Sequence, residues 1–169
     1  GNIGVVLETV RFYVTPGGTP EPPIQVALTN NSLEVERLRI GVKSDQHGKE
    51  IPSSWISIQP ASVELKPGIS RTLAVNISPP RKYSSKAGRY PFVIEVYSEG
   101  KAEPIDSVDC VLTVTAFSQP NIQVNPLQVF AGQTMQVRVE NGGNTTETYE
   151  VAWEGRDREL LEFEVVPPP

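Results

Sequence analysis

Apolar and polar side chains alternate with a period of two through most of residues 1–116. The alternating stretches are 24–28, 38–42, 56–58, 63–65, 73–77, 90–96 and 108–114. Successive side chains of an extended strand point to opposite faces, so this period predicts strands with one buried face. No window holds the 3.6-residue period of an amphipathic helix over several turns. The chain is therefore predicted to be all-β.

Turn-forming residues separate these stretches. They are Pro16-Gly17-Gly18, Asn30-Asn31-Ser32, Gln46-His47-Gly48, Pro67-Gly68 and Glu99-Gly100. Seven or eight short strands in one such segment are typical of an Ig-like antiparallel β-sandwich. Pro67-Gly68 predicts a tight turn, because proline fixes φ and glycine accepts a positive φ.

An internal repeat sets the predicted domain boundaries. A shift of 111 positions places Val26 and Asn30 on Val137 and Asn141, and the segment 24–30 reappears as 135–141. We predict a complete sandwich over 1–116, a short linker over 117–120 and the N-terminal half of a second Ig-like module over 121–169. Gly1 stands where an initiator Met is expected, so we interpret the chain as a segment of a larger multidomain protein.

Half a sandwich leaves an apolar sheet face and a strand edge uncovered. Three outcomes are open: a neighbouring molecule completes the second unit, the unit packs on the first module, or it is poorly ordered. The first outcome makes a homo-oligomer through the incomplete module a candidate assembly. A four-residue linker is too short for a flexible tether, so we expect the two units to lie nearly end to end.

Composition excludes several classes of function. Residues 1–116 hold 12 Lys and Arg against 12 Asp and Glu, and residues 117–169 hold 3 against 8. Neither part is basic enough to follow a phosphate backbone, which argues against nucleic acid. One Cys and one His exclude an intrachain disulfide and a zinc site. No apolar run is long enough for a membrane span, so no membrane contact is expected.

One string of motifs resembles a known class of module. It runs Trp55-Ile56-Ser57-Ile58-Gln59-Pro60 to Pro67-Gly68, then Leu73-Ala74-Val75-Asn76-Ile77, and ends in Gly88-Arg89-Tyr90. These motifs resemble the bacterial Ig-like modules of glycosidases and surface proteins, including the alpha-galactosidase-associated type, and the major-sperm-protein-like sandwiches. The resemblance implies a spacer, platform or ligand-binding role. It also favours a cell-surface, periplasmic or secreted location.

Several residues carry structural predictions. Gly88-Arg89-Tyr90 resembles a tyrosine corner, in which a phenol hydrogen-bonds to nearby backbone. Asn30 and Asn141 are predicted to close their strands as turn formers rather than as ligands. Cys110 is in phase with the apolar residues of its stretch, so we expect it to be buried and unreactive.

The predicted contact residues lie mainly in the connection 81–89. Arg81, Lys82, Tyr83, Lys86 and Arg89 place four cations and a tyrosine at one end of the sandwich, where such folds often bind. The candidate occupants are an anionic partner, a glycan or the acidic second unit of another copy, with a plain solvated loop as the alternative.

Tryptophan is the second candidate contact. Trp153 is a candidate for sugar stacking, although for Trp153 and for Trp55 we favour packing across the sandwich. His47 with Asp45 and Glu50 is interpreted as a solvated turn rather than a metal site.

These observations favour a non-catalytic role. Glu162 and Glu164 share a strand face, but nothing indicates a cleft around them. The sole His lies in a turn, and the sequence has no Gly-x-Ser-x-Gly motif that would present a nucleophilic serine. We expect no catalytic, cofactor-binding or metal site. The predicted function is a structural spacer and protein-interaction module that contacts other domains or a protein partner. The alternative is a carbohydrate-binding accessory module that acts through its end loops and an exposed Trp.

Overall fold

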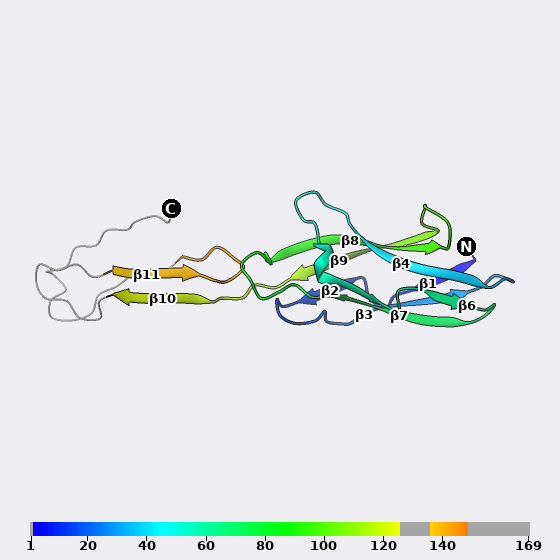
Figure 1. The fold of residues 1–169 in the computed structure, drawn as a ribbon, viewed down its shortest axis with the longest axis horizontal. Coiled ribbons are helices and arrows are strands. Elements are labelled where there is room, and N and C mark those ends of the chain that lie inside the picture. Colours follow the sequence, from blue (N-terminus) through cyan, green and yellow to red (C-terminus); the bar gives the residue numbers. More distant parts are fainter. Residues whose placement is uncertain (1, 126–135, 149–169) are drawn as a thin grey trace, which may run out of the picture.

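The computed structural model describes residues 2–125 and 136–148. Residues 2–116 form nine strands and one short 3₁₀ helix, η1 (Ser53–Trp55). The strands are β1 (Ile3–Val6), β2 (Arg11–Val14), β3 (Ile24–Asn30), β4 (Glu36–Ser44), β5 (Ile56–Gln59), β6 (Val63–Leu65), β7 (Ser70–Ile77), β8 (Gly88–Ser98) and β9 (Asp106–Val114). They build a four-stranded sheet in the order β1-β3-β7-β5 and a five-stranded sheet in the order β2-β9-β8-β4-β6. The two sheets face each other as the layers of an Ig-like β-sandwich (Figure 1).

The core lies between the two sheets and follows the predicted alternation. In β8, every second residue is buried, from Tyr90 through Phe92 and Ile94 to Val96. In β3 of the four-stranded sheet, Val26 and Leu28 are likewise buried. They face the five-stranded sheet, which contains β8, across the core. Phe12 and Phe92 meet in the core with ring centroids 6.3 Å apart. The prediction of an all-β sandwich is confirmed.

The first strands differ from the expected all-antiparallel arrangement. The chain crosses from one layer to the other between Val6 and Arg11, so β1 pairs antiparallel with β3 whereas β2 pairs parallel with β9. The chain keeps its direction when it changes sheets. This direction is antiparallel to β3 in the first sheet and parallel to β9 in the second. Alternation did not reveal these strands, because apolar residues stand next to one another in both, as in Val5-Val6 and Phe12-Tyr13-Val14.

The turn between β6 and β7 has the predicted geometry. Gly68 has φ of 77°, and the Ile69 N–H donates to the Lys66 carbonyl at 3.1 Å. Pro67 and Gly68 therefore occupy the two central positions of a tight turn that carries the chain from β6 in the five-stranded sheet to β7 in the four-stranded sheet. A residue with a Cβ would be strained at Gly68 because of its positive φ.

The second unit is represented by a separate two-stranded sheet of β10 (Pro120–Asn125) and β11 (Gln136–Asn141). It extends from the sandwich along the long axis of the molecule (Figure 1). Ile122 pairs with Val139, and both share one face with Val137. Ile122 and Val137 are 62% and 46% exposed, so an apolar face is open to solvent in the described part of this unit.

Other features of the second unit lie outside the described residues. They include Trp153, Glu162 and Glu164, and most of the predicted segment 121–169. In residues 2–125 and 136–148, no helix has the length and apolar character of a membrane span.

Candidate functional site

Asn144 joins the second unit to the end of the sandwich. It is 1% exposed and takes part in five hydrogen bonds. Its Nδ2 donates to the carbonyl oxygens of Ser85 at 2.9 Å and Thr115 at 2.8 Å, and its Oδ1 accepts from the Phe117 N–H at 2.7 Å. Its own N–H donates to Phe117, and its carbonyl accepts from Ala87. Every polar group of Asn144 is therefore satisfied at this joint.

The socket around Asn144 comes from two segments of the first module. One is the connection between β7 and β8, and the other is the chain that leaves β9 at Val114. Phe117 belongs to the second segment and is 7% exposed, and the Arg81 guanidinium carbon lies 4.3 Å from the centroid of its ring. A cation over an aromatic face contributes about 0.5–1 kcal/mol at an exposed site. We call the contacts of Asn144, Ser85, Thr115 and Phe117 the joint.

Two consecutive glycines make this close approach possible. The Gly142 N–H donates to the Gln119 carbonyl at 2.9 Å, and a Cβ on Gly142 would lie 2.9 Å from that oxygen. A Cβ on Gly143 would overlap the carbonyl oxygen of Phe117. Glycine is thus required at both positions because the linker backbone passes against this loop.

The tyrosine corner shapes one wall of the socket. The Tyr90 hydroxyl donates to the Lys86 carbonyl at 2.5 Å, as the Gly88-Arg89-Tyr90 motif predicted. Burial raises the pKa of the Tyr90 phenol. Nearby, the buried Ser85 donates its hydroxyl proton to the Pro80 carbonyl at 2.5 Å. These two bonds hold the connection so that the Ser85 carbonyl is aimed at Asn144.

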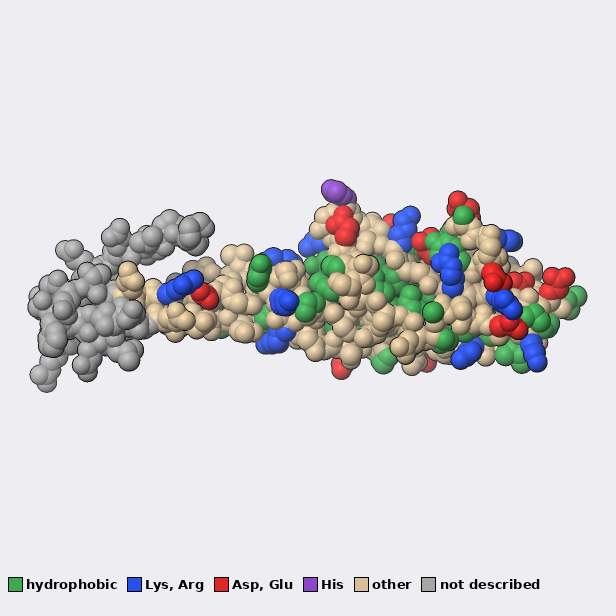
Figure 2. Space-filling model, in the orientation of Figure 1, with side chains coloured by type: hydrophobic (Ala, Val, Ile, Leu, Met, Phe, Trp, Pro, Cys, Tyr) green, Lys and Arg blue, Asp and Glu red, His purple; other side chains and the backbone are tan. Residues whose placement is uncertain are grey.

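The structure divides the predicted contact residues into two groups. All five are exposed, and Arg81 differs from Lys82, Tyr83, Lys86 and Arg89 in that its guanidinium lies over the ring of Phe117. Lys86 Nζ lies 5.4 Å from the centroid of the Tyr83 ring. None of the four basic side chains, Arg81, Lys82, Lys86 and Arg89, forms an ion pair with another described residue. Basic side chains lie at the narrow neck between the sandwich and the two-stranded sheet on the face that Figure 2 shows.

Asn30 closes β3 through its side chain. Its Nδ2 donates to the carbonyl oxygens of Glu34 at 2.7 Å and Leu65 at 2.8 Å, and its Oδ1 accepts from the Ser32 N–H at 2.9 Å. The residue is fully buried. Its predicted role as a turn former is confirmed, and the turn is made by side-chain-to-backbone bonds.

Asn141 repeats this local geometry at the end of β11. Its Nδ2 donates to the Thr145 carbonyl at 2.7 Å, and its Oδ1 accepts from the Gly143 N–H at 3.0 Å. The sequence offsets of four and two residues are those of Asn30, so the prediction for Asn141 is also confirmed. Unlike Asn30, Asn141 is exposed and has no bond equivalent to that with Leu65 among the described residues.

The strand partners of the two asparagines also correspond. Asn30 lies opposite Ile3, the first residue of β1, and Asn141 lies opposite Pro120, the first residue of β10. The residue after each asparagine donates its N–H to the residue before that strand, at 2.8 Å in Asn31 to Asn2 and at 2.9 Å in Gly142 to Gln119. The β10–β11 pair is therefore a local copy of the β1–β3 pair.

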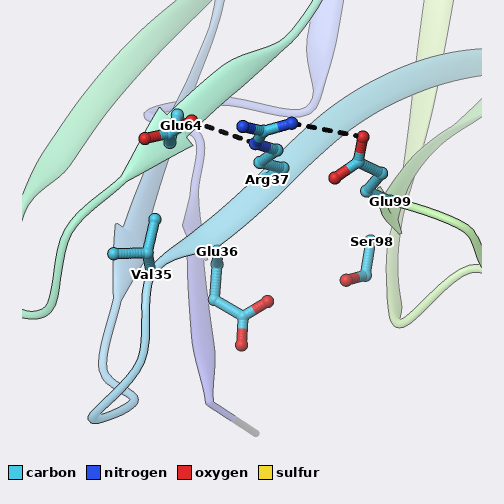
Figure 3. A pocket seen from close by; sticks show the side chains of 6 residues that line it. All are labelled: Val35, Glu36, Arg37, Glu64, Ser98 and Glu99. Carbon is cyan, nitrogen blue, oxygen red and sulfur yellow. Dashed lines mark hydrogen bonds and ion pairs between the residues drawn. The ribbon is translucent and has the colours of Figure 1, made fainter.

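A surface hollow near the other end of the sandwich is lined by charged side chains (Figure 3). Arg37 lies between two carboxylates, with Nε 3.0 Å from Glu64 Oε2 and Nη1 3.5 Å from Glu99 Oε1. The hydrogen bond that Arg37 donates to Glu64, and then the charge of Glu99, raise the pKa of Arg37. All three side chains are more than half exposed, so solvent screens the pairs. Arg37 thus pairs with two of the three carboxylates that line this hollow, Glu64 and Glu99, and the third is Glu36.

The remaining candidates take the positions expected for ordinary structural residues. Cys110 is 3% exposed, and burial, with a smaller effect of Asp109, raises the pKa of its thiol to about 11. The prediction that it is buried is confirmed. His47 is exposed in its turn, with Nδ1 3.5 Å from Glu50 Oε1. Within residues 2–125 and 136–148, no three His, Cys, Asp or Glu side chains are grouped to hold a metal ion.

Trp55 packs on the core rather than standing free. It is half-buried, and its ring meets that of Tyr90 edge-on with centroids 6.4 Å apart. This agrees with the favoured interpretation of this residue. Trp153 lies outside the described residues, so the sugar-stacking alternative for that residue stays a prediction.

No protein-family model matches the sequence, and a comparison with curated proteins finds no relative. Among solved structures, the chain is similar to a family 123 glycoside hydrolase from Clostridium perfringens, with a TM-score of 0.53 and 15% identity over 68% of this chain and 27% of that chain. The chain thus spans about a quarter of that hydrolase.

Two further matches have lower scores. WR4, an MSP family member of C. elegans, has a TM-score of 0.39 and 10% identity over 68% of this chain and 98% of that chain. The PapD-like domain 7 of human CEP192 has a TM-score of 0.43 and 13% identity over 67% and 83%. At such identities the likeness concerns the fold alone.

Proposed function

We propose that this chain is a non-catalytic spacer and interaction module that holds its neighbour at a fixed angle through the joint. The observation that carries the proposal is the burial of Asn144, with all its polar groups bonded, between the connection that contains Ser85 and the linker at Phe117. A flexible tether would expose its linker to water. Here the linker backbone is itself a partner in the contact.

The hydrogen bonds and the burial at the joint favour a defined orientation of the second unit. Each net hydrogen bond contributes about 0.5–1.5 kcal/mol, and breaking the joint also exposes Phe117 to water. Because Asn144 bonds at once to Ser85, Thr115 and Phe117, moving it out of this site breaks several hydrogen bonds together. The joint therefore resists bending between the two units, whereas a flexible linker would set only the maximum distance between them.

We infer that the second unit belongs to a module of the same kind as the first. The correspondence of Asn141 with Asn30, including the offsets of their hydrogen bonds and the register of their strands, supports this assignment. Under the proposal, the joint is a contact between consecutive sandwich modules of one polypeptide. The open apolar face around Ile122 then corresponds to the face that β1 and β3 bury in the first module.

The orientation can be measured with two spin labels. Lys43→Cys and Gln136→Cys place them on exposed positions of the sandwich and of β11, in a Cys110→Ala background. We expect a narrow distance distribution for the parent chain, because the joint fixes the angle. Asn144→Ala should broaden it, whereas Thr146→Ala, an exposed change in the same loop, should leave it narrow. A broad distribution in the parent chain itself would contradict the proposal.

A further inference from the structure

We infer that Asn141–Gly142 is a site of spontaneous deamidation whose rate is controlled by the closure of the joint. It is the single Asn-Gly dipeptide of the sequence. Glycine after asparagine favours this reaction, because the absence of a Cβ lets the backbone nitrogen reach the side-chain carbonyl carbon. The inference concerns the joint on which the proposed function also rests.

Hydrogen bonds directly beside the joint hold the groups that react. The nucleophile is the Gly142 backbone nitrogen, whose proton is bonded to the Gln119 carbonyl at 2.9 Å. The leaving group is Asn141 Nδ2, which donates to Thr145 at 2.7 Å, and Oδ1 accepts from Gly143 at 3.0 Å. These bonds keep the side chain turned along the loop and the nitrogen engaged in the strand pair. Reaction therefore requires opening of the Gly142–Gln119 contact, which lies next to Asn144.

The chemistry needs only water. The Gly142 nitrogen attacks Asn141 Cγ and loses its proton, the Cγ–Nδ2 bond breaks, and ammonia leaves with that proton. The resulting cyclic imide then takes up one water molecule and opens to aspartate or isoaspartate. Either product replaces a donor to Thr145 with a carboxylate oxygen, and isoaspartate also lengthens the backbone by one carbon. An opened joint would thus be unable to close in its original geometry.

The first module provides a control within the same chain. Asn30 has the same side-chain geometry, but it is fully buried, it makes the additional bond to Leu65, and Asn31 follows it instead of glycine. We expect no modification at Asn30 while the sandwich is folded. A difference between the two sites in one sample is independent of buffer and handling.

Peptide mapping by mass spectrometry during incubation of the whole chain at mildly alkaline pH tests the inference. Amide loss at Asn141 in the folded chain should be at least about tenfold slower than in the chain denatured by guanidinium, because local opening limits the reaction. Asn144→Ala and Gly143→Ala open the joint by different routes, and both should bring the rate toward the denatured value. Thr146→Ala should keep the slow rate.

Two results would overturn the inference. One is an equal rate in the folded and denatured parent chains, and the other is continued protection of Asn141 in both joint variants. Slow alkylation of Cys110 in each variant shows that the sandwich itself is still folded. The spin-label distances separate this inference from the proposed function. A narrow distribution of spin-label distances with rapid deamidation of Asn141 rejects only the control of deamidation by the joint. A broad distribution of these distances with a protected Asn141 rejects only the fixed angle between the units.

Discussion

The Nδ2 atom of Asn144 lies 2.9 Å from the carbonyl oxygen of Ser85, although 59 positions separate the two residues in the sequence. This hydrogen bond connects a loop of the second unit to the connection between β7 and β8 of the first. Both residues are buried, so water cannot replace either partner without opening the contact.

Asn144→Asp should open the joint with little change in side-chain volume. The change removes both Nδ2 donors and places a carboxylate against two carbonyl oxygens, which should cost about 2–4 kcal/mol in joint stability. Hydrogen exchange of the Phe117 and Gly142 amides should accelerate accordingly. Asn31→Asp, at an exposed position, is the matched control and should leave both amides protected. Unchanged exchange in Asn144→Asp would show that the joint does not depend on this side chain.

Gly143→Ala should displace the loop from the linker. The added Cβ would overlap the Phe117 carbonyl, and backbone cannot give way as a flexible side chain can. We expect loss of the Phe117 amide protection without unfolding of the sandwich. Gly41→Ala is the control, since its Cβ would meet the Tyr97 ring at an ordinary 3.5 Å and glycine is unfavourable within a strand. That variant should be neutral or more stable by up to about 1 kcal/mol.

Asn30→Asp and Asn141→Asp form a matched pair at corresponding positions. Asn30 is fully buried, so a carboxylate there would face the Glu34 and Leu65 carbonyls without water, and we expect a loss of about 3–5 kcal/mol in unfolding free energy. Asn141 is exposed, so its substitution should cost the sandwich less than about 1 kcal/mol. Urea denaturation of both variants measures the difference. Equal losses would mean that the burial of Asn30 does not determine its contribution.

Tyr90→Phe should destabilise the first module through one lost donor. The Lys86 carbonyl loses its hydrogen bond in a partly buried setting, which costs about 1–2 kcal/mol. Tyr13→Phe is the control because Tyr13 is 52% exposed, and its change should be close to zero. Thermal denaturation of the two variants provides the comparison, and a Tyr90→Phe chain as stable as the parent would contradict a structural role for the tyrosine corner.

Cys110 should make stability depend on pH in the alkaline range. The folded chain retains the thiol proton to about pH 11, whereas the ordinary pKa of 9.0 applies after unfolding. Between these values the unfolded chain binds fewer protons, so stability should fall as pH rises from about 9 to about 11, by ~2 kcal/mol. The measurement is the difference in unfolding free energy between the parent chain and Cys110→Ala across this range. A difference that stays constant with pH would show that the thiol pKa is not raised.

Sequence patterns predicted the sandwich because its determinants are local. Alternation placed β8 with its buried series from Tyr90 to Val96, and Pro67-Gly68 predicted both the position and the φ of a turn. Cys110 was placed in the core by its phase within β9. Each of these features depends on neighbours within a few residues, which a single sequence contains.

The joint could not be predicted in the same way. Its partners are 27, 29 and 59 positions from Asn144, and the asparagine side chain gives no periodic signal. The connection 81–89 drew attention through its cations, but the groups that contact Asn144 are carbonyls and N–H groups common to all residues. Gly142-Gly143 was the available signal, because two glycines beside a strand end can indicate a close backbone approach.

The length of β8 has a mechanical consequence. Its 11 residues run from Gly88, beside the joint, to Ser98, near the Arg37 ion pairs at the opposite end of the sandwich. At about 3.3 Å per residue, this strand covers roughly 35 Å. Domains attached at the two ends would therefore be kept that far apart, a separation that hydrogen-bonded strands maintain more strictly under tension than an extended linker of equal reach.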